Sequence, residues 1–543
     1  MASLSPYQTT LLGTQLAAHL LRRASYVYTK ADILQLASKT ADQAIDELFT
    51  FSPPSLVEPI DYQSGDHWIN QGSPPVSASF HLNRYIKGWW MDEAMKSLSV
   101  EYKMMFFLHT TFTTSIFDEL SQDFWDHQEL LRFFVRGSFR EYAIKVSLSN
   151  LMSDYLDNNV NFGFNPNENY AREFLELFTI GKGPQINPGD YTHFTEDDVI
   201  NATKVLSGWR KGDRNNPAHQ DPDTGLNRNY PVYIYHAHGD KTFSYHFQNA
   251  TITDAVDAND MYRELTDFVN LVFAQQETAR HLARRMYRFF VSSNISTEIE
   301  TDIIEPLSTV LFDNDYNLEI GLKALLKSQH FFDMDDNFHS DEIIGGLIKP
   351  PLDLITNTVS FFQIERPDPV NNSFWHYFQF YHRGMFQDTF ENAGFNLFSP
   401  ESVAGYAAFH QSPNYDKNWF HSGSIIARYK IGDMFLTGFR WTANELIGSK
   451  LEAAQFVQNS GYFTNPADAT ILVEELLEYL FPAPPATDRF NYFLNDIFLN
   501  NLSPINWAFE WQSYLNTQDD TNVSIPLKQL FEAVLYAPEY QTF

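Results

Sequence analysis

Apolar residues recur every three to four positions along most of this chain, and this period is typical of amphipathic helices. The pattern is clearest in residues 8–50, 125–160 and 277–291. One stretch differs, because residues 230–247 alternate apolar and polar side chains about a turn, which predicts a small β-hairpin. We therefore predict a mainly α protein, a large multi-helix, bundle-like architecture with a β-hairpin insertion around 230–247.

A cluster of acidic residues at 333–342 marks the domain boundary that we predict. Residues 1–335 would form an N-terminal helical domain that carries a long loop or hairpin segment at 210–250. Residues 336–543 would form a C-terminal helical domain that packs closely on the first.

Residues 165–178 form the most distinctive predicted helix. Asn165 has the position of an N-cap, Pro166 suits the first helical turn, and Glu168 has the spacing of a capping box. At 100° per residue, the apolar side chains of this stretch fall on one face. The other face gathers Glu168, Asn169, Arg172, Glu173 and Glu176. Neighbouring carboxylates and an arginine perturb each other's pKa values, so this face is a candidate acid–base site.

Composition narrows the possible partners. The 543 residues carry a formal net charge of −31, which disfavours nucleic acid and anionic lipid as ligands. The chain has no cysteine, and this excludes disulfides and thiolate metal sites. No run of about 18 apolar residues occurs, so we expect no membrane span, and the N-terminus shows no secretory signal. Aromatic residues reach 16%, and we expect most of them in the core.

Histidines are the next candidates. His236 and His238 have the spacing of two ligands on one strand face, so a divalent metal such as zinc or iron is a possible cofactor. His109 lies among apolar neighbours, where it is either a hydrogen-bonded core residue or a proton carrier. Asp221 and Asp223 resemble an incomplete calcium loop.

Arginines form a stripe on the helix predicted at 277–291. Arg280, Arg284 and Arg288 follow one another at intervals of four residues. Two interpretations are open. The stripe either forms structural ion pairs with acidic helices, among them the Glu168–Glu176 face, or it clamps a carboxylate, phosphate or sulfate group.

Several motifs together resemble a bacterial family called domain of unknown function 1800. They are Asn167-Glu168-Asn169-Tyr170-Ala171-Arg172-Glu173, Phe178 to Gly181, Phe194 to Val199, Ser207-Gly208-Trp209, Lys241-Thr242-Phe243, Ala283 to Val291 and Lys349-Pro350-Pro351. The resemblance implies a mostly helical protein that is exported, to the periplasm or cell surface, with a sulfatase-like partner protein. It supplies no activity. Thr111 and Ala237 stand where the family tends to have His and Asp.

Two hypotheses about function follow. The first is an enzyme that acts on a polar or anionic substrate, such as a saccharide or a sulfated molecule, by hydrolysis or group transfer. Its candidate catalytic residues are Glu168, Arg172, Glu173, Glu176 and His109, and its candidate substrate-binding residues are Asn167, Asn169, Trp209, Lys241, Arg284 and Arg288. The second is a non-catalytic scaffold or binding protein of the cell envelope whose Glu/Arg motif is a structural salt-bridge network.

Overall fold

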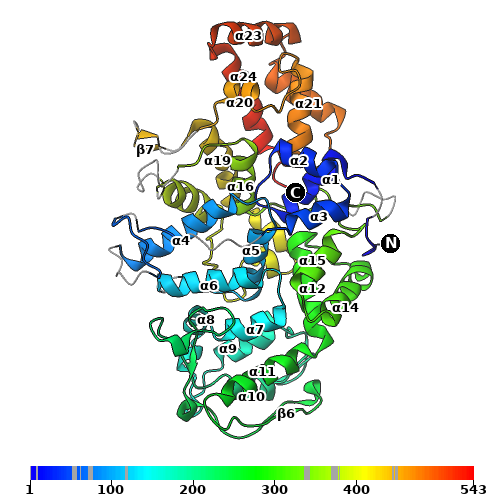
Figure 1. The fold of residues 1–543 in the computed structure, drawn as a ribbon. Coiled ribbons are helices and arrows are strands. Elements are labelled where there is room, and N and C mark those ends of the chain that lie inside the picture. Colours follow the sequence, from blue (N-terminus) through cyan, green and yellow to red (C-terminus); the bar gives the residue numbers. More distant parts are fainter. Residues whose placement is uncertain are drawn as a thin grey trace.

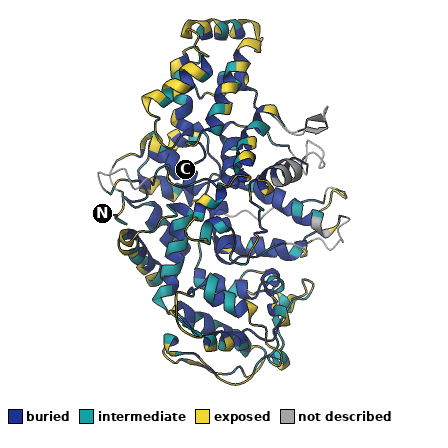
Figure 2. Ribbon diagram, turned by 180° about the vertical axis from the view of Figure 1, so that it is seen from behind, coloured by how far each residue is buried: buried dark blue, intermediate teal, exposed yellow. Residues whose placement is uncertain are grey.

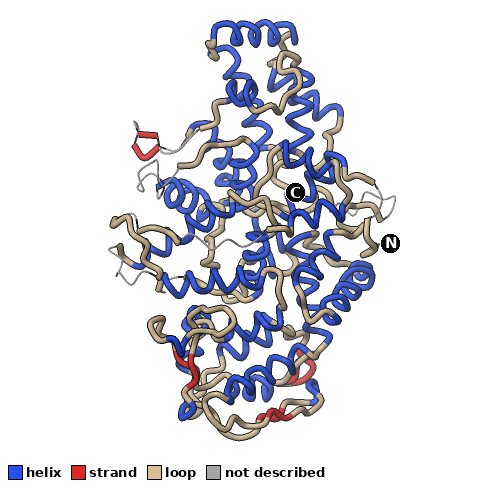
Figure 3. Tube along the Cα trace, in the orientation of Figure 1, coloured by secondary structure: helices blue, strands red, loops and turns tan. Residues whose placement is uncertain are grey.

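The structure is a computed structural model of the 543-residue chain. It describes all residues except 1, 8–9, 52–57, 62, 71–76, 117–119, 336–342, 368–376, 378, 439, 443–444 and 447–449, and it does not describe the side chains of 79–80, 382–384, 386–388, 440–442 and 445–446. Helices dominate the described residues, which confirms the predicted fold class (Figure 1, Figure 3).

The helices of the first half are α1 (Gly13–Ala24), α2 (Lys30–Ala37), α3 (Ala41–Leu48), α4 (Ser79–Ala94), α5 (Glu101–Thr111), α6 (Ser121–Phe134), α7 (Phe139–Ser147), α8 (Asn150–Tyr155), α9 (Asn169–Glu173), α10 (Glu196–Val205), α11 (Asp260–Phe273) and α12 (Gln276–Phe290). Those of the second half are α13 (Thr297–Ile299), α14 (Glu305–Asp313), α15 (Leu318–Leu326), α16 (Pro351–Phe361), α18 (Ala407–His410), α19 (Ser424–Thr437), α20 (Ala453–Asn459), α21 (Ala469–Leu480), α22 (Thr487–Asn491), α23 (Pro504–Thr517) and α24 (Thr521–Tyr536).

Shorter helical segments connect them. Turns of π-helix are η2 (Phe174–Phe178), η6 (Glu300–Ile304), η7 (Phe380–Glu391) and η9 (Tyr492–Phe498), and 3-10 turns are η1 (Asn158–Val160), η3 (Pro217–His219), η4 (Tyr233–Tyr235), η5 (Tyr245–Phe247) and η8 (Tyr415–Trp419).

The strands are short and form antiparallel pairs. They are β1 (Gln185–Asn187) with β2 (Asp190–Tyr191), β3 (Trp209–Arg210) with β4 (Tyr230–Pro231), β5 (Lys241–Thr242) with β6 (Thr251–Ile252), and β7 (Arg440–Thr442) with β8 (Glu445–Leu446). The predicted β-structure around 230–247 is therefore present with a different pairing. β4 and β5 each pair with a strand outside that range, and two 3-10 turns occupy the residues that we expected to form longer strands.

Figure 2 shows that buried residues run through the centre of the elongated molecule, while α23 at one end is largely exposed. Aromatic rings pack in this core as expected. Phe106, for example, has its ring centroid 5.9 Å from that of Phe395 and 6.2 Å from that of Phe398. The core therefore joins residues from both halves of the chain.

Contacts of the N-terminal helices with the C-terminal ones hold the two predicted domains together. On α1, Arg22 donates a hydrogen bond of 2.7 Å to the carbonyl oxygen of Tyr479 on α21. On α5, Lys103 forms an ion pair with Asp353 on α16. The division into two closely packed domains at 335/336 stays a prediction, and residues 336–342 lie outside the described residues. Among the described residues, none of the helices has the length and apolar character to cross a bilayer.

Candidate functional site

The helix at the Asn167–Glu173 motif begins later than predicted. α9 begins at Asn169, with Glu168 at its N-cap position and no side-chain cap. Asn165 lies in a turn instead, where its N–H donates to the carbonyl oxygen of Phe162 at 2.9 Å. The Asn167 side chain accepts the N–H of Asn169 at 3.1 Å. The predicted cap at Asn165 is wrong, because Asn side chains stabilise turns as readily as helix N-termini.

The polar face of this segment is an ion-pair network near the surface. The Arg172 guanidinium binds both carboxylate oxygens of Glu196 on α10, at 3.0 and 2.7 Å, and Glu168 at 3.0 Å. Lys182 pairs with Glu176 at 2.9 Å. The hydrogen bond from Arg172 lowers the pKa of Glu196. Three predicted catalytic residues, Glu168, Arg172 and Glu176, thus have ion-pair partners.

Glu173 differs from its neighbours. Its carboxylate is half-buried and has no hydrogen-bond or ion-pair partner among the described residues. Burial, and then the charge of Glu176, raise its pKa above the usual value. The π-helical segment η2 follows directly, and π-bulges occur frequently at functional sites. Glu173 therefore remains the residue of this face that best suits acid–base chemistry.

His109 lies in the aromatic core on α5. It is fully buried, and neither ring nitrogen has a hydrogen-bond partner among the described residues. Its ring centroid is 4.9 Å from that of Phe398 and 6.1 Å from that of Tyr406. Burial lowers its pKa well below the usual value, so the ring is neutral. Nothing described joins it to the Glu168–Glu176 face, and this environment does not support a role as a proton carrier.

The arginine stripe on α12 has two kinds of surroundings. Arg280 pairs with Glu305 at 2.8 Å, and Arg284 pairs with Glu277 at 2.6 Å and with Glu300 at 2.5 Å. The structural interpretation therefore holds for these two residues, but with acids on α12, η6 and α14 in place of the Glu168–Glu176 face that we named as a possible partner.

Arg288, one turn farther along, has no carboxylate within ion-pair distance among the described residues. Its guanidinium lies 4.7 Å from the ring centroid of Tyr415, and its Nε is buried without a described hydrogen-bond partner. Burial lowers the pKa of Arg288. Arg288 therefore lacks, among the described residues, the carboxylate partner that neutralises the charge of Arg280 and of Arg284.

A cavity of about 750 Å³ opens beside this end of α12. Its lining includes Arg288, Ser292, Asn294, Tyr415, Asp416 and Lys417. Asp416 is 5% exposed. Its Oδ2 accepts the N–H of Ile348 at 3.0 Å, and its Oδ1 is buried without a hydrogen-bond partner in the described part of the chain. The cavity therefore presents a guanidinium, an ammonium and a carboxylate within one polar wall.

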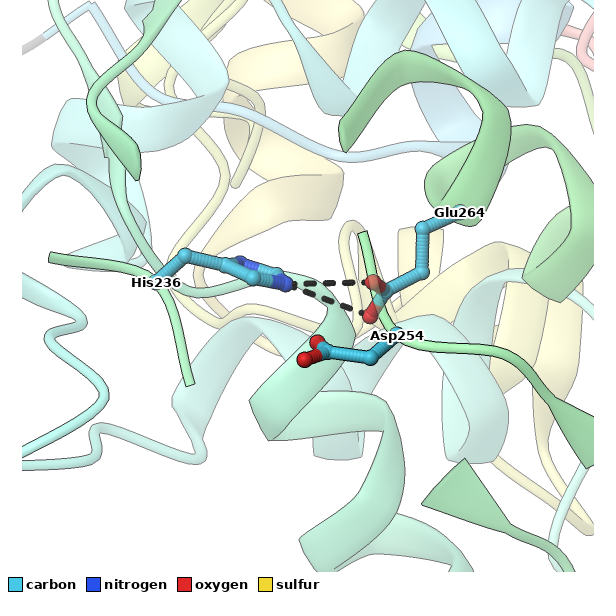
Figure 4. A group of neighbouring side chains, drawn as sticks. All are labelled: His236, Asp254 and Glu264. Carbon is cyan, nitrogen blue, oxygen red and sulfur yellow. Dashed lines mark hydrogen bonds and ion pairs between the residues drawn. The ribbon is translucent and has the colours of Figure 1, made fainter. Parts of the chain in front are cut away.

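A second polar group lies in the segment after α10. His236 follows η4, Lys241 lies on β5, Asp254 follows β6 and Glu264 lies on α11. Figure 4 shows the His236, Asp254 and Glu264 side chains pointing toward one another. Their ligand atoms lie within 4.8 Å of each other, and the side chains of His236 and Glu264 are fully buried. This group of four residues is called the His236 cluster below.

Close backbone packing positions His236. Gly208 has φ +81°, and a Cβ at this residue would lie 2.8 Å from the backbone nitrogen of His236. A side chain larger than glycine would push the two backbones apart. The predicted substrate contact Trp209, next in the chain, is fully buried against Tyr262, so it contributes to the core.

Lys241 fills the centre of the His236 cluster. Its Nζ lies 2.7 Å from Glu264 Oε1, 3.0 Å from Asp254 Oδ1 and 3.4 Å from His236 Nε2. The residues offer a nitrogen and two carboxylates, a donor set that suits zinc, manganese or iron. His238 is half-exposed at the edge, with its Nδ1 3.8 Å from Asp254 Oδ2. The predicted pair of histidine ligands therefore does not converge on one point, although His236 does face two carboxylates.

In the Asp221 loop, as in the His236 cluster, basic side chains bind the carboxylates that we considered as metal ligands. Lys145 Nζ lies 2.8 Å from Asp221 Oδ2 and 2.5 Å from Asp223 Oδ2, and Arg228 also binds Asp221 at 3.0 Å. Side-chain cations thus hold the carboxylates that we compared with a calcium loop.

Sequence reasoning brought Arg288, His236 and Lys241 forward and missed Asp254, Glu264 and Asp416. The missed acids lie outside the motifs, and no fixed spacing links them to His236 or Arg288. Of the remaining predicted contacts, Asn169 is exposed at the start of α9 and Asn167 is half-buried just before it. The predicted site is therefore divided among separate places in the fold.

Comparison with known proteins gives one result. No curated protein and no solved structure matches the chain. The model of one family matches residues 19–542, nearly the whole chain. The chain thus belongs to the family described as protein of unknown function (DUF1800).

Proposed function

We propose that this protein binds a polar substrate carrying a carboxylate, sulfate or phosphate group in the cavity beside Arg288, and acts on it by hydrolysis or group transfer. The observation that carries the proposal is the Arg288 guanidinium, which has no carboxylate partner among the described residues and lies in the wall of this cavity. Guanidinium groups bind oxyanions with paired hydrogen bonds.

The size and charge of the cavity support this ligand class. Its volume of about 750 Å³ lies within the range of small-molecule sites. Arg288 and Lys417 contribute two positive charges and Asp416 one negative charge, so the wall is locally cationic in a chain whose net charge is −31. This cationic wall attracts an anion, whereas the net negative charge of the chain repels it elsewhere.

The neutral polar groups indicate what else the ligand contains. Ser292 and Asn294 offer hydrogen-bonding groups in the same lining as Arg288, and Asp416 offers an acceptor. A sugar acid or a sulfated sugar has both features, an oxyanion and several hydroxyls. In the enzymatic form of the proposal, Asp416 takes a proton from water or from a substrate hydroxyl.

Export and a sulfatase-like partner protein, which the family resemblance implies, belong to the same proposal. They make sulfate the first anion to test. Neither is needed for the cavity to bind an oxyanion.

Anion binding tests the proposal directly. Sulfate, phosphate and acetate are titrated calorimetrically into the wild type, Arg288→Gln and the matched control Arg280→Gln, which removes the same charge from the same helix. A charge-assisted hydrogen bond contributes about 1.5–3 kcal/mol, so Arg288→Gln is expected to weaken binding at least about tenfold. The control retains the wild-type affinity. Equal affinities in all three proteins, or equal losses in both variants, would overturn the proposal.

The scaffold hypothesis also has an observation in its favour. Arg172, Glu168, Glu176 and Glu196 are held in ion pairs, as a structural network requires. Hydrolysis assays with sulfate and phosphate esters on the wild type and Asp416→Asn separate the two hypotheses. An enzyme hydrolyses one of these esters, and its Asp416→Asn variant loses turnover and keeps anion binding, whereas a binding protein shows no turnover in either form.

A further inference from the structure

We propose that His236, Asp254 and Glu264 form a divalent-cation site that this chain fills with the ammonium group of Lys241. Figure 4 shows the side chains of His236, Asp254 and Glu264 meeting, and Lys241 on β5 contacts all three. The Lys241 nitrogen lies 2.7 to 3.4 Å from a ligand atom of each of the other three. A metal ion bound by all three ligands would occupy the same space.

The ligands are held as metal ligands are. The Nδ1 of His236 lies 2.9 Å from the carbonyl oxygen of Ser207, which can only accept a hydrogen bond. Its Nε2 lies 3.3 and 3.2 Å from the two carboxylate oxygens of Glu264. In a metal-bound form, Nδ1 would donate to the Ser207 carbonyl and the Nε2 lone pair would face the ion. Metal-binding histidines are commonly oriented by such a hydrogen bond from the ring nitrogen that does not bind the metal.

The carboxylates are also fixed. The N–H of Ala255 donates to Glu264 Oε2 at 2.8 Å, which leaves Oε1 to face Lys241. Asp254, whose side chain is 28% exposed, lies where the cluster approaches solvent. An ion would enter past this residue and His238.

Charge explains why the cluster needs a cation. The Asp254 and Glu264 carboxylates together carry a charge of −2, and the Glu264 side chain has no exposed surface. The Lys241 ammonium reduces this charge to −1. A divalent ion in place of the ammonium brings the sum to zero. Removal of the lysine leaves both carboxylates without a cation, and a bound divalent ion would then neutralise them.

Metal content and calorimetry with Zn²⁺ and Mn²⁺ test the inference on the full chain. The wild type is expected to bind neither ion in the cluster. Lys241→Ala leaves room for an ion and is expected to bind one equivalent of Zn²⁺ at least about 100-fold more tightly than the wild type. Zn²⁺ then raises the Tm of this variant and leaves that of the wild type unchanged.

Control variants assign the ion to the cluster. Addition of His236→Gln to Lys241→Ala abolishes the tight binding. Lys182→Ala removes a lysine whose ion-pair partner among the described residues is Glu176, and this variant gains no metal. If Lys241→Ala does not fold in the absence of metal, Lys241→Gln keeps a donor for the carboxylates and tests the same loss of charge.

Two results would overturn the inference. The first is wild-type protein that binds one equivalent of metal and loses it in His236→Gln, because Lys241 would then not be the resident cation. The second is a folded Lys241→Ala or Lys241→Gln variant that binds no Zn²⁺ more tightly than the wild type does.

Discussion

Loss of one buried ion pair is expected to destabilise the whole chain. Lys103 on α5 and Asp353 on α16 form this pair, and each side chain is only 3% exposed. Burial lowers the pKa of Lys103 and raises that of Asp353, so each charge is tolerated because the other is present. Lys103→Met removes the cation and leaves the Asp353 carboxylate in the core.

The magnitude follows from what remains around Asp353. Breaking a buried pair by removing one partner costs about 3–5 kcal/mol. Lys349 and Arg23 also act on the Asp353 carboxylate, so we expect the lower end, about 3 kcal/mol. The double variant Lys103→Met, Asp353→Leu removes both charges and is expected to regain most of the loss, because no unpaired charge stays buried.

Urea unfolding followed by circular dichroism measures the effect. Lys103→Met shifts the midpoint to lower urea, and the double variant shifts it back. A loss below about 1 kcal/mol in the single variant would show that the pair contributes no more than a surface pair does. A double variant as unstable as the single one would show that lost packing at residue 103, and not the unpaired carboxylate, destabilises the protein.

Two further predictions concern α9. Arg172→Ala is expected to lower the free energy of unfolding by only about 1 kcal/mol near neutral pH, because the side chain of Arg172 is 26% exposed and that of Glu196 is 36% exposed. A loss in urea unfolding as large as that of Lys103→Met would contradict this prediction. The loss shrinks as the pH falls below 4.5, the ordinary pKa of Glu196, since Arg172 depresses that pKa in the fold. Glu173→Gln is expected to raise the free energy of unfolding near neutral pH. Because the fold raises the pKa of Glu173, the ionised carboxylate destabilises the folded state at pH values above its usual pKa of 4.5. Unfolding at acid and neutral pH tests the sign, because equal effects at both would remove burial as the cause.

Local sequence signals predicted the helices well. The helix expected at 277–291 spans Gln276–Phe290. The apolar pattern that predicts it depends on residues within one or two turns. The start of α9 was mispredicted for the same local reason, because Asn165 and Pro166 suit a turn as well as a helix N-terminus.

The His236 cluster shows the limit of such signals. The spacing of His236 and His238 indicated two ligands on one strand, but residues 236–240 do not form a strand, and His238 lies at the edge of the cluster. Asp254 and Glu264 enter the cluster from the segment after β6 and from α11. Long-range packing brings them together, so no fixed spacing records it.

The arginines of α12 show why residue type alone did not separate structure from function. Glu277, Glu300 and Glu305 reach Arg280 and Arg284 because α12, η6 and α14 pack side by side along that part of the helix. Arg285 is satisfied by the carbonyl oxygens of Leu177 and Thr110. Arg288 comes after the last of these partners and meets a cavity. In a chain with 68 acidic and 37 basic residues, Arg288 has no carboxylate partner among the described residues and lines a cavity, which is why we propose that a ligand neutralises its charge.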